Sequence, residues 1–349
     1  MALGRTNVGG SGSKVKLDGE KITTKLELTS YKGSNPLEVG RDGEIIPVNT
    51  LLLSDLELLN GAPEVTVDGV AVEETLALES IGAEFDIGAL PYNFYQGAAV
   101  VCDDCIHLLS SNAGSANYNA HYKFDGTEWT SVSTLPYDAY GLGALVDSGE
   151  ICIFGGGDST KFYGKKFRRW DGSVWNEEST MPEKFSLGVI YKGEIHVLGT
   201  NKGHYKWSDG AWTSVSTMPY TAAGTSYIAK VYNDEIHVLG VSGSTNATTH
   251  YKFDGTAWTQ LEDVPFTLGA VIGDVYKGEI HIITSVNSST ERMHCKWNGA
   301  EWKQLSKVAY SPRSGRAVAF RNRLHYMGSS SNDNYKKHFA HKIVYDKEV

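Results

Sequence analysis

The sequence has few cysteines and no long apolar run, and each shortage excludes a class of protein. Four cysteines among 349 residues are too few for the disulfide framework that small secreted domains need. No window approaches the roughly 18 to 20 apolar residues of a membrane-spanning helix, and residues 1–30 lack the apolar core of a secretory signal. We therefore expect a globular protein that is made in the cytoplasm, does not insert into membranes and depends on a packed core.

Positive charge is also scarce. The chain carries 32 Lys and Arg against 41 Asp and Glu, a net charge of -9. Because non-specific binding to a phosphate backbone depends on Lys and Arg, we do not expect nucleic acid as a partner. The remaining composition, 41% hydrophobic and 21% charged, is that of an ordinary folded protein rather than a disordered chain.

Glycine and large aromatic residues are abundant, and they lie in repeated motifs. The chain has 38 Gly, 19 Tyr and 8 Trp, a mixture that favours many short strands joined by turns. One motif reads HYKFDGTEWTSVSTLPY at His121–Tyr137 and returns, with changes, from Lys166, His204, His250 and His294. A second motif alternates with it in six copies: Val100–Leu109, Val146–Gly156, Ile190–Gly199, Val231–Gly240, Val275–Thr284 and Phe320–Gly328.

Both motifs predict β-hairpins. The second motif is two β-rich runs around a polar pair such as Lys192-Gly193, which is a hairpin signal; we name these runs strands A and B. The first motif is an aromatic run, an Asp-Gly or Asn-Gly turn and a Trp run, which we name strands C and D. Four short antiparallel strands in each 40 to 50 residues, roughly, are typical of propeller blades.

The two ends of the repeat region predict how the ring closes. The sixth unit has only one further strand, Phe339–Asp346, so its strand D is missing. Upstream, Ala83–Tyr92 resembles Glu128–Tyr137 with one residue deleted and Phe85 at the Trp position. We expect this strand to complete the sixth blade and cover its edge. The predicted fold is an all-β, six-bladed propeller of four-stranded antiparallel blades over residues 83–349, preceded by an N-terminal arm over residues 1–82.

Two aromatic columns follow from this alignment, and they contain all eight Trp. They are Phe124, Trp170, Trp207, Phe253, Trp297 and Tyr345 on strand C, and Phe85, Trp129, Trp175, Trp212, Trp258 and Trp302 on strand D. We expect them to be buried between blades. The units resemble kelch repeats from about Phe85 to Val349: a Gly follows strand B, then a Tyr/Phe-Asp turn, a Trp and a Leu/Met-Pro. The double Gly of that pattern is intact only at Gly155-Gly156. The resemblance implies that strand A is innermost.

Histidine also falls in two columns. His107, His196, His237, His281 and His325 share one position of strand B, and His121, His204, His250 and His294 share one position of strand C. Because both positions change together in the second blade, to Cys152 and Phe167, we expect the two columns to touch. In the sixth blade His341 lies one residue away from the column, where Lys342 stands. A ring of such positions is too wide for metal–nitrogen bonds of ~2.0 to 2.1 Å, so at most one pair per blade could share an ion. We expect structural histidines and no metal.

Signals for catalysis are weak. Cys102 and Cys105 form a CxxC around a turn, which predicts free thiols or an incidental hairpin disulfide; zinc or redox chemistry is the alternative, but zinc needs two further ligands. No nucleophile elbow, HExxH or P-loop motif occurs. A sialidase-like propeller needs arginines from several blades, whereas Arg313 and Arg316 share one loop, and only Arg168, Arg169 and Arg292 lie elsewhere as candidates. We predict that the protein is not an enzyme and uses no cofactor.

The two faces of the propeller are expected to differ. The B–C and D–A loops must emerge on one face, and the tight A–B and C–D turns on the other. The D–A loops carry aromatic residues that we take as candidate binding residues around the channel mouth: Tyr92, Phe94, Tyr95, Tyr137, Tyr140, Tyr220, Tyr227, Phe266 and Tyr310. Exposed Tyr beside Ser and Asn suits a hydroxyl-rich ligand or a protein partner. The alternative is that these rings pack on neighbouring prolines such as Pro136, Pro182 and Pro219.

The first eighty residues do not form a blade. Met1–Ser13 is rich in Gly and Ser and is expected to be flexible; hairpins are predicted about Asp18-Gly19 and Asp68-Gly69, with an apolar segment at Thr50–Asn60. So short a segment is better explained as an arm that docks onto another chain.

The first ten residues, MALGRTNVGG, resemble the start of structural proteins in tail modules of phages and prophages of Gram-positive bacteria. The resemblance implies a virion protein of the tail or baseplate, present in several copies. Its arm would bind other virion proteins, and its propeller a host-surface glycan or protein receptor, or another virion protein. The alternative is a cytoplasmic kelch-type adaptor for protein–protein interaction.

Overall fold

The computed structural model describes seven short strands within residues 15–71 and most of residues 80–344. Residues 112–118, 139, 158–163, 184, 200, 221–226, 241–247, 266–267, 287–290, 309–313 and 330–334 are outside this description. The chain divides into two compact units, Met1–Gly82 with Lys342–Val349, and Ala83–His341. Among the described residues no helix is long and apolar enough to cross a membrane.

The first unit contains small antiparallel pairings. Strand β1 (Val15–Leu17) pairs with β2 (Glu20–Ile22), and β4 (Glu38–Val39) pairs with β5 (Ile45–Ile46). Strand β6 (Val65–Val67) lies between β3 (Leu26–Leu28) and β7 (Val70–Ala71). The hairpins predicted about Asp18-Gly19 and Asp68-Gly69 are therefore confirmed, whereas the apolar segment Thr50–Asn60 lies outside the described residues.

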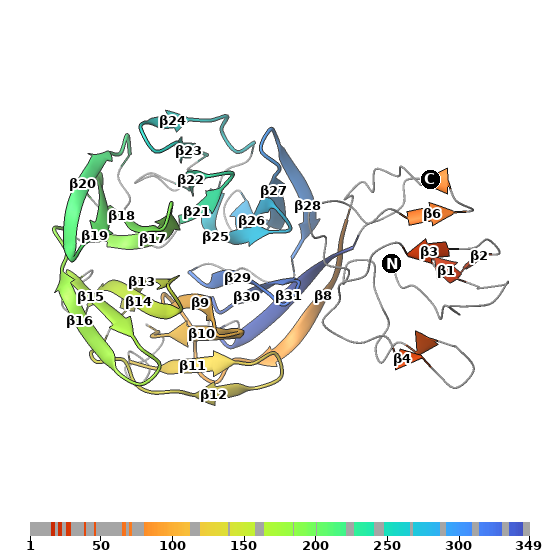
Figure 1. Ribbon diagram of the computed structural model, residues 1–349, viewed down its shortest axis with the longest axis horizontal. Helices are drawn as coiled ribbons and strands as arrows, with labels where there is room; N and C mark the ends of the chain where they lie inside the picture. Colours follow the sequence, from red (N-terminus) through yellow and green to blue (C-terminus); the bar gives the residue numbers. More distant parts are fainter. Residues whose placement is uncertain are drawn as a thin grey trace. The chain divides into compact units, whose positions relative to one another are not determined.

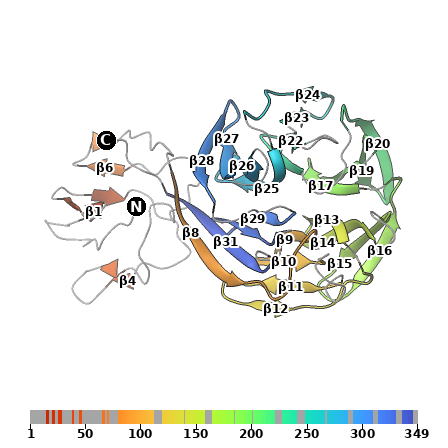
Figure 2. The ribbon, with the colours of Figure 1, turned by 180° about the vertical axis from the view of Figure 1, so that it is seen from behind.

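The second unit is a ring of six four-stranded antiparallel sheets, so the predicted six-bladed β-propeller is confirmed (Figures 1 and 2). The first three blades are β9 (Ala98–Cys102), β10 (Cys105–Leu109), β11 (His121–Phe124) and β12 (Trp129–Ser131); β13 (Tyr140–Asp147), β14 (Glu150–Gly157), β15 (Lys166–Trp170) and β16 (Trp175–Thr180); and β17 (Phe185–Tyr191), β18 (Glu194–Gly199), β19 (Gly203–Ser208) and β20 (Ala211–Thr217).

The next two blades are β21 (Ile228–Tyr232), β22 (Glu235–Leu239), β23 (His250–Phe253) and β24 (Trp258–Gln260); and β25 (Leu268–Tyr276), β26 (Glu279–Val286), β27 (Glu291–Trp297) and β28 (Trp302–Lys307). The sixth blade has the order β29 (Arg316–Phe320), β30 (Arg323–Met327), β31 (Lys337–Val344) and β8 (Ser80–Ala89). Its outer strand thus comes from the N-terminal side of the propeller, as the repeat alignment predicted. In every blade the strands stand in the order A, B, C, D.

The tight turns that join strands A and B explain the polar pairs of the second motif. Asp103 and Asp104 have φ of 47° and 53°, and Asn233 and Asn322, in other turns, have φ of 49° and 60°. Two successive residues with positive φ make the type I′ turn, whose twist matches the flanking strands. All six A–B turns have this form, because each of their twelve residues has positive φ.

Equivalent hydrogen bonds fix the position of the closing strand. The amide of Leu90 donates to the carbonyl of Lys336 at 2.8 Å, as Leu135 does to Asn119 and Met181 does to Lys165. Leu90 therefore occupies the same place as Leu135 in the first blade, which confirms the alignment of the Leu-Pro-Tyr sequences.

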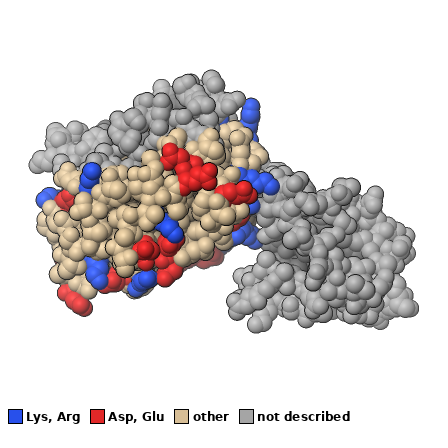
Figure 3. All heavy atoms as spheres, turned by 90° about the horizontal axis from the view of Figure 1, so that it is seen from above, with Lys and Arg blue, Asp and Glu red and all other residues tan. Residues whose placement is uncertain are grey.

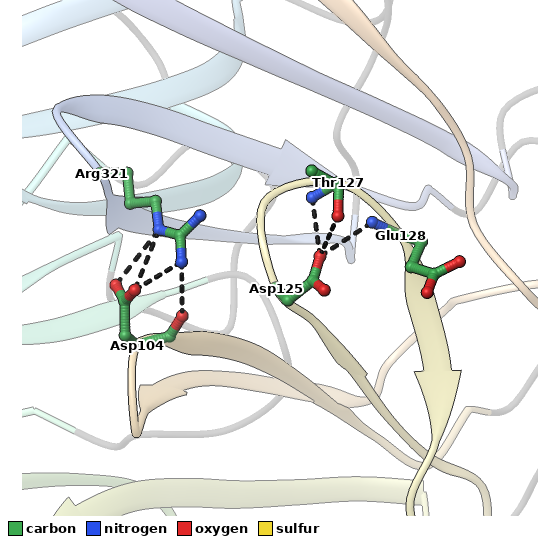
Figure 4. Close-up of polar contacts among 5 residues, drawn as sticks. All are labelled: Asp104, Asp125, Thr127, Glu128 and Arg321. Carbon is green, nitrogen blue, oxygen red and sulfur yellow. Dashed lines mark hydrogen bonds and ion pairs between the residues drawn. The ribbon is translucent and has the colours of Figure 1, made fainter.

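On the face of the propeller that carries the A–B and C–D turns, an ion pair joins the last blade to the first. Arg321, in the β29–β30 turn, reaches Asp104 in the β9–β10 turn, with Nη2 at 2.5 Å from Oδ2 (Figure 4). Next to it Asp125 closes the β11–β12 turn: its Oδ1 accepts the hydroxyl and amide of Thr127 and the amide of Glu128, and these bonds hold the pKa of Asp125 at about 2. The ring is thus closed by a shared sheet and by this contact between turns.

The sixth blade corrects one part of the sequence alignment. Leu324 pairs with His341 and Met327 with His338, whereas in the first blade Ile106 pairs with Phe124 and Leu109 with His121. His341 therefore stands in the aromatic column of strand C, and His338 stands in the histidine column. The expectation that Lys342 and Tyr345 fill these columns is wrong, because the strand enters the sheet four residues earlier; Tyr345 itself lies outside the described residues.

Candidate binding site

A cavity of about 100 Å³ lies on the propeller axis. Strands β9, β13, β17, β21, β25 and β29, the first strand of each blade, all contribute to its wall. Strand A is thus innermost, as expected. The lining residues Ala98, Ile228 and Arg316 are the first residues of β9, β21 and β29, and these starts follow the D–A loops. The cavity therefore occupies the loop-side half of the channel.

A ring of small residues lines this cavity. Each A strand has Ala or Gly four residues before its turn, and all six line the cavity: Ala99, Ala144, Gly188, Ala229, Gly273 and Ala317. A methyl group on Gly188 would come within 2.6 Å of the Phe154 ring, and one on Gly273 would collide with the carbonyl of His281. Small side chains are therefore required here by the close approach of neighbouring strands.

The charged residues that line the cavity, among those described, are Lys230 and Arg316. Lys230 Nζ lies 2.8 Å from Oδ1 of Asp274, which stands at the equivalent position of the next blade. The other oxygen of Asp274 accepts the amide of Ala319 at 2.8 Å. Arg316 donates from Nη1 to the carbonyl of Gly315 at 2.8 Å. Most of the lining residues are apolar in type, but more of the exposed wall is polar than apolar, and two cations are held at fixed places.

Four of the nine candidate aromatic residues are buried, so the expectation of exposed rings is wrong for them. Tyr92, Phe94, Tyr220 and Tyr227 are 0–7% exposed. Tyr92 follows β8 of the sixth blade and donates its hydroxyl to the carbonyl of Ser110 in the first, at 3.1 Å. Phe94 lies against Gly328 at the end of β30. These rings pack between adjacent blades, because each D–A connection crosses from one blade to the next. Tyr227 alone of the four lines the cavity.

The other candidates lie in three different situations. Tyr137 is half-buried; its hydroxyl donates to the carbonyl of Gly155 at 3.2 Å, and burial raises its pKa to about 12. Tyr95 is half-buried and its ring lies 6.1 Å from that of Tyr335, which precedes β31. The backbone of Tyr140 begins β13, and nothing is described of its side chain. Phe266 and Tyr310 lie outside the described residues.

The histidine columns meet as predicted. In five blades Nδ1 of the strand-B histidine lies 2.8–2.9 Å from Nε2 of the strand-C histidine: His107–His121, His196–His204, His237–His250, His281–His294 and His325–His338. Burial lowers the pKa of every one of these histidines, to about 4 for His237 and about 3 for His250. The pairs are therefore neutral at physiological pH, with one ring donating to the other. Among the described residues no group of three metal-ligating side chains occurs.

Each strand-C histidine also packs against aromatic rings of the next blade. His204 lies 4.7 Å from Phe253 and 5.5 Å from Trp258, between ring centroids. Phe167 replaces it in the second blade and lies 5.3 Å from Trp207 and from Trp212. The predicted role of the aromatic columns in packing between blades is confirmed, although the expected burial is incomplete: Trp170, Trp175 and Trp297 are buried, the other five Trp are half-buried, and Phe85 is 38% exposed.

The contact between the fifth and sixth blades is an exception to this packing pattern. There His294 meets His341 at 5.2 Å instead of a pair of large rings, because His341 holds the strand-C position. Phe85 instead lies under Arg323, 4.8 Å from the guanidinium carbon. The contact between the fifth and sixth blades thus lacks the pair of large rings that the other contacts between blades have.

The cysteines are free thiols. Cys102 and Cys105 face each other across the β9–β10 turn without a disulfide, and the Cys102 thiol donates to the carbonyl of Gly149 in the second blade at 3.3 Å. Burial raises the pKa of the Cys102 thiol, and it raises that of Cys152 to about 12. Thiols that stay protonated are poor nucleophiles and metal ligands. These positions pack rather than react.

Surface charge does not gather in one sign on the side of the propeller drawn in Figure 3, where acidic and basic residues lie among one another. The fold and this site define a six-bladed β-propeller with an axial cavity, a class of protein that can mediate binding. The chain is similar to the solved structure of YjhT, with 12% identity and a TM-score of 0.59 over 72% of this chain and 95% of YjhT. At that identity the likeness shows the fold alone. No family model matches the sequence, and no curated protein matches it.

Sequence reasoning missed the cavity and its charges. Lys230 and Asp274 stand three residues before their turns in adjacent blades, and the small residues stand one position earlier. An alignment of the A strands alone contains part of this signal, because a position that is Ala or Gly in all six repeats marks a close approach of neighbouring strands. Arg316 was placed with Arg313 in one loop, whereas it begins strand β29 and lines the cavity.

Proposed function

We propose that the propeller is a binding head that recognises its ligand on the loop face, around the axial cavity. The observation that carries this proposal is the cavity itself: it lies in the loop-side half of the channel, all six blades build it, and two cations stand in an otherwise uncharged wall. A concave pocket with a few convergent polar groups is the default candidate for a ligand site. Tyr95 and Tyr335 add partly exposed aromatic area on the same face.

We further propose that the chain is a kelch-type structural protein of a phage or phage-tail-like particle. Two features support this. The opening sequence resembles tail-module proteins, and the first 82 residues group apart from the ring as a separate unit. In this proposal the N-terminal unit attaches the chain, in several copies, to other virion proteins, and the propeller meets a glycan or protein of the host surface.

Incorporation into particles tests this assignment. Particles are assembled with the full chain and with a chain that begins at residue 80, which keeps β8 and therefore the closed ring. We expect mass spectrometry of purified particles to find the full chain and not the shortened one, while the shortened chain stays soluble and folded. Equal incorporation of both chains would show that attachment does not use the N-terminal unit. Absence of the full chain from particles would leave the cytoplasmic adaptor as the better proposal.

A further inference from the structure

We propose that the axial cavity binds a polyhydroxylated ligand, such as the terminal sugar of a glycan, through hydrogen bonds to the main chain of the six A strands. This inference rests on the proposed binding function, since it names the chemical class that the loop-face site accepts. It goes beyond the aromatic residues of the loops, because the recognition is placed inside the channel and depends on backbone groups.

The turns between strands A and B determine which main-chain groups face the axis. In a hairpin with a two-residue turn, the residues that flank the turn exchange both hydrogen bonds, and bonded and non-bonded pairs then alternate along the strands. All six blades have this flanking pair, for example Tyr276 with Glu279 and Phe320 with Arg323. The second and fourth residues before each turn therefore direct their N–H and C=O groups away from strand B.

Asp274 shows this orientation in two blades. Val275 and Ala319 each stand second before a turn, and their amides donate to Oδ1 of Asp274 at 3.0 Å and to Oδ2 at 2.8 Å, not to strand B. Strand A stands at the end of the strand order in every blade, so the side away from strand B is the channel. The main-chain groups at the fourth position therefore face the cavity as well.

The fourth residue before each turn is the small residue that lines the cavity. These six residues are Ala99, Ala144, Gly188, Ala229, Gly273 and Ala317. Each carries one N–H donor and one C=O acceptor, and its side chain is too small to cover them. Main-chain groups, together with Lys230 and Arg316, thus explain why more of the exposed wall is polar than apolar although most lining residues are apolar in type.

A wall that carries donors and acceptors around one axis favours hydroxyl groups. The cavity of about 100 Å³ has room for several water molecules, and a ligand that displaces ordered water loses affinity unless it reproduces the hydrogen bonds of that water. A hydroxyl both donates and accepts, as water does, so several hydroxyls on one ring can pair with both kinds of wall group. An apolar ligand would leave these groups unpaired, which costs free energy.

Lys230 adds a charged donor to the same wall. Its Nζ lies 2.8 Å from Oδ1 of Asp274, a contact that holds the side chain in place and uses one of the three N–H donors of the ammonium group. Hydrogen bonds from an ionised donor are stronger than those between neutral groups, so a sugar hydroxyl that accepts from Lys230 is bound well. The pair of Lys230 and Asp274 is neutral as a unit and therefore does not itself demand a charged ligand.

The methyl glycosides of glucose, galactose, mannose and N-acetylglucosamine test the proposal with the full chain. Each is titrated into isotope-labelled protein, and the backbone amide resonances are followed by NMR. We expect at least one glycoside to shift the amides of the six small residues, whereas amides that bond to strand B, such as those of Val100 and Leu145, shift much less. Cyclohexanol, a ring of the same size with one hydroxyl, should bind roughly tenfold more weakly or less.

A pair of variants separates the cavity from the rest of the propeller. A99L/A144L places larger side chains at two half-buried positions of the cavity wall and should lower the glycoside affinity roughly tenfold, because it covers main-chain groups. A257L is the matched control, since Ala257 is exposed in the β23–β24 turn on the other face; its affinity should equal that of the unaltered protein. Circular dichroism shows whether each variant is folded, and the amide shifts of the unaltered protein decide the question if A99L/A144L is not.

Several outcomes would overturn the proposal. The absence of amide shifts with all four glycosides would show that the cavity does not accept sugars, and shifts confined to loop residues would place the sugar on the loop surface. Equal binding of cyclohexanol would mean that the hydroxyls play no part. Unchanged affinity in a folded A99L/A144L would place the ligand outside the channel. Each of these results leaves the particle assignment standing, since incorporation into particles is measured independently of sugars.

Discussion

The buried histidines make the stability of the ring steeply dependent on pH. All eleven histidines of the chain are buried, and burial lowers the pKa of each. In the unfolded chain the pKa is about 6.5, so between that value and the folded pKa the unfolded state binds protons that the folded state does not. Stability is therefore fully present above about pH 6.5 and falls as the pH falls toward 4. The loss is about 1.4 kcal/mol per pH unit for each histidine.

Summed over eleven histidines, this loss is roughly 15 kcal/mol per pH unit, as large as the whole stability of a typical protein. We therefore expect cooperative acid unfolding between about pH 6 and pH 5, before most carboxylates titrate. The assay is urea unfolding at a series of pH values, followed by tryptophan fluorescence. A ring that keeps the same urea midpoint at pH 4.5 as at pH 7 would refute the reasoning.

The second blade supplies a matched variant. It carries Cys152 and Phe167 where other blades carry a histidine pair, and Phe167 packs on Trp207 and Trp212 at 5.3 Å. H237C/H250F copies this arrangement into the fourth blade and removes two titrating groups. The free energy of unfolding should then fall less between pH 6.5 and pH 5.5, by about 2 kcal/mol. Identical slopes for the variant and the unaltered protein would show that this pair does not carry the effect.

Three further predictions concern closure, packing and recognition. A chain that begins at residue 90 lacks β8 and should melt well below one that begins at residue 80, because the sixth blade loses its outer strand; equal melting temperatures would refute closure by β8. Trp212→Ala should lower the free energy of unfolding by about 3 kcal/mol in a urea titration. It removes the ring that packs on Phe167 and an indole hydrogen bond of 2.8 Å to Ser179. W212F keeps an aromatic ring and should lose less stability in the same titration. Tyr95→Ala should weaken adsorption of particles to cells at least tenfold without a change in melting temperature, whereas Lys277→Ala on the turn face should leave adsorption unchanged; equal adsorption of both variants would remove Tyr95 from the binding surface.

The repeats predicted the blades because each blade is a local unit. A–B and C–D hairpins are closed by turn residues that stand within the motif itself, so position and pairing can be read from sequence. Even the closing strand could be placed, since Leu90 and Pro91 repeat the Leu-Pro of the first blade. The error in the sixth blade arose where a motif was incomplete: His341 resembles a column histidine, and only the sheet register shows that it fills an aromatic position.

The site was harder to predict because its residues come together through the ring rather than through the motif. Tyr92 and Tyr220 look like exposed loop aromatics in sequence, yet they are buried where one blade passes into the next. Lys230 and Arg316 are single departures from the repeat pattern. Their shared cavity depends on the closure of all six blades around one axis, which no single repeat encodes.

The most direct test of the proposed function is electron microscopy of intact particles with antibody fragments raised against the loop face and against the turn face of the propeller. The account predicts that fragments decorate the outside of particles and that only those against the loop face block adsorption to cells. Blocking by turn-face fragments alone, or particles that no fragment decorates, would contradict it.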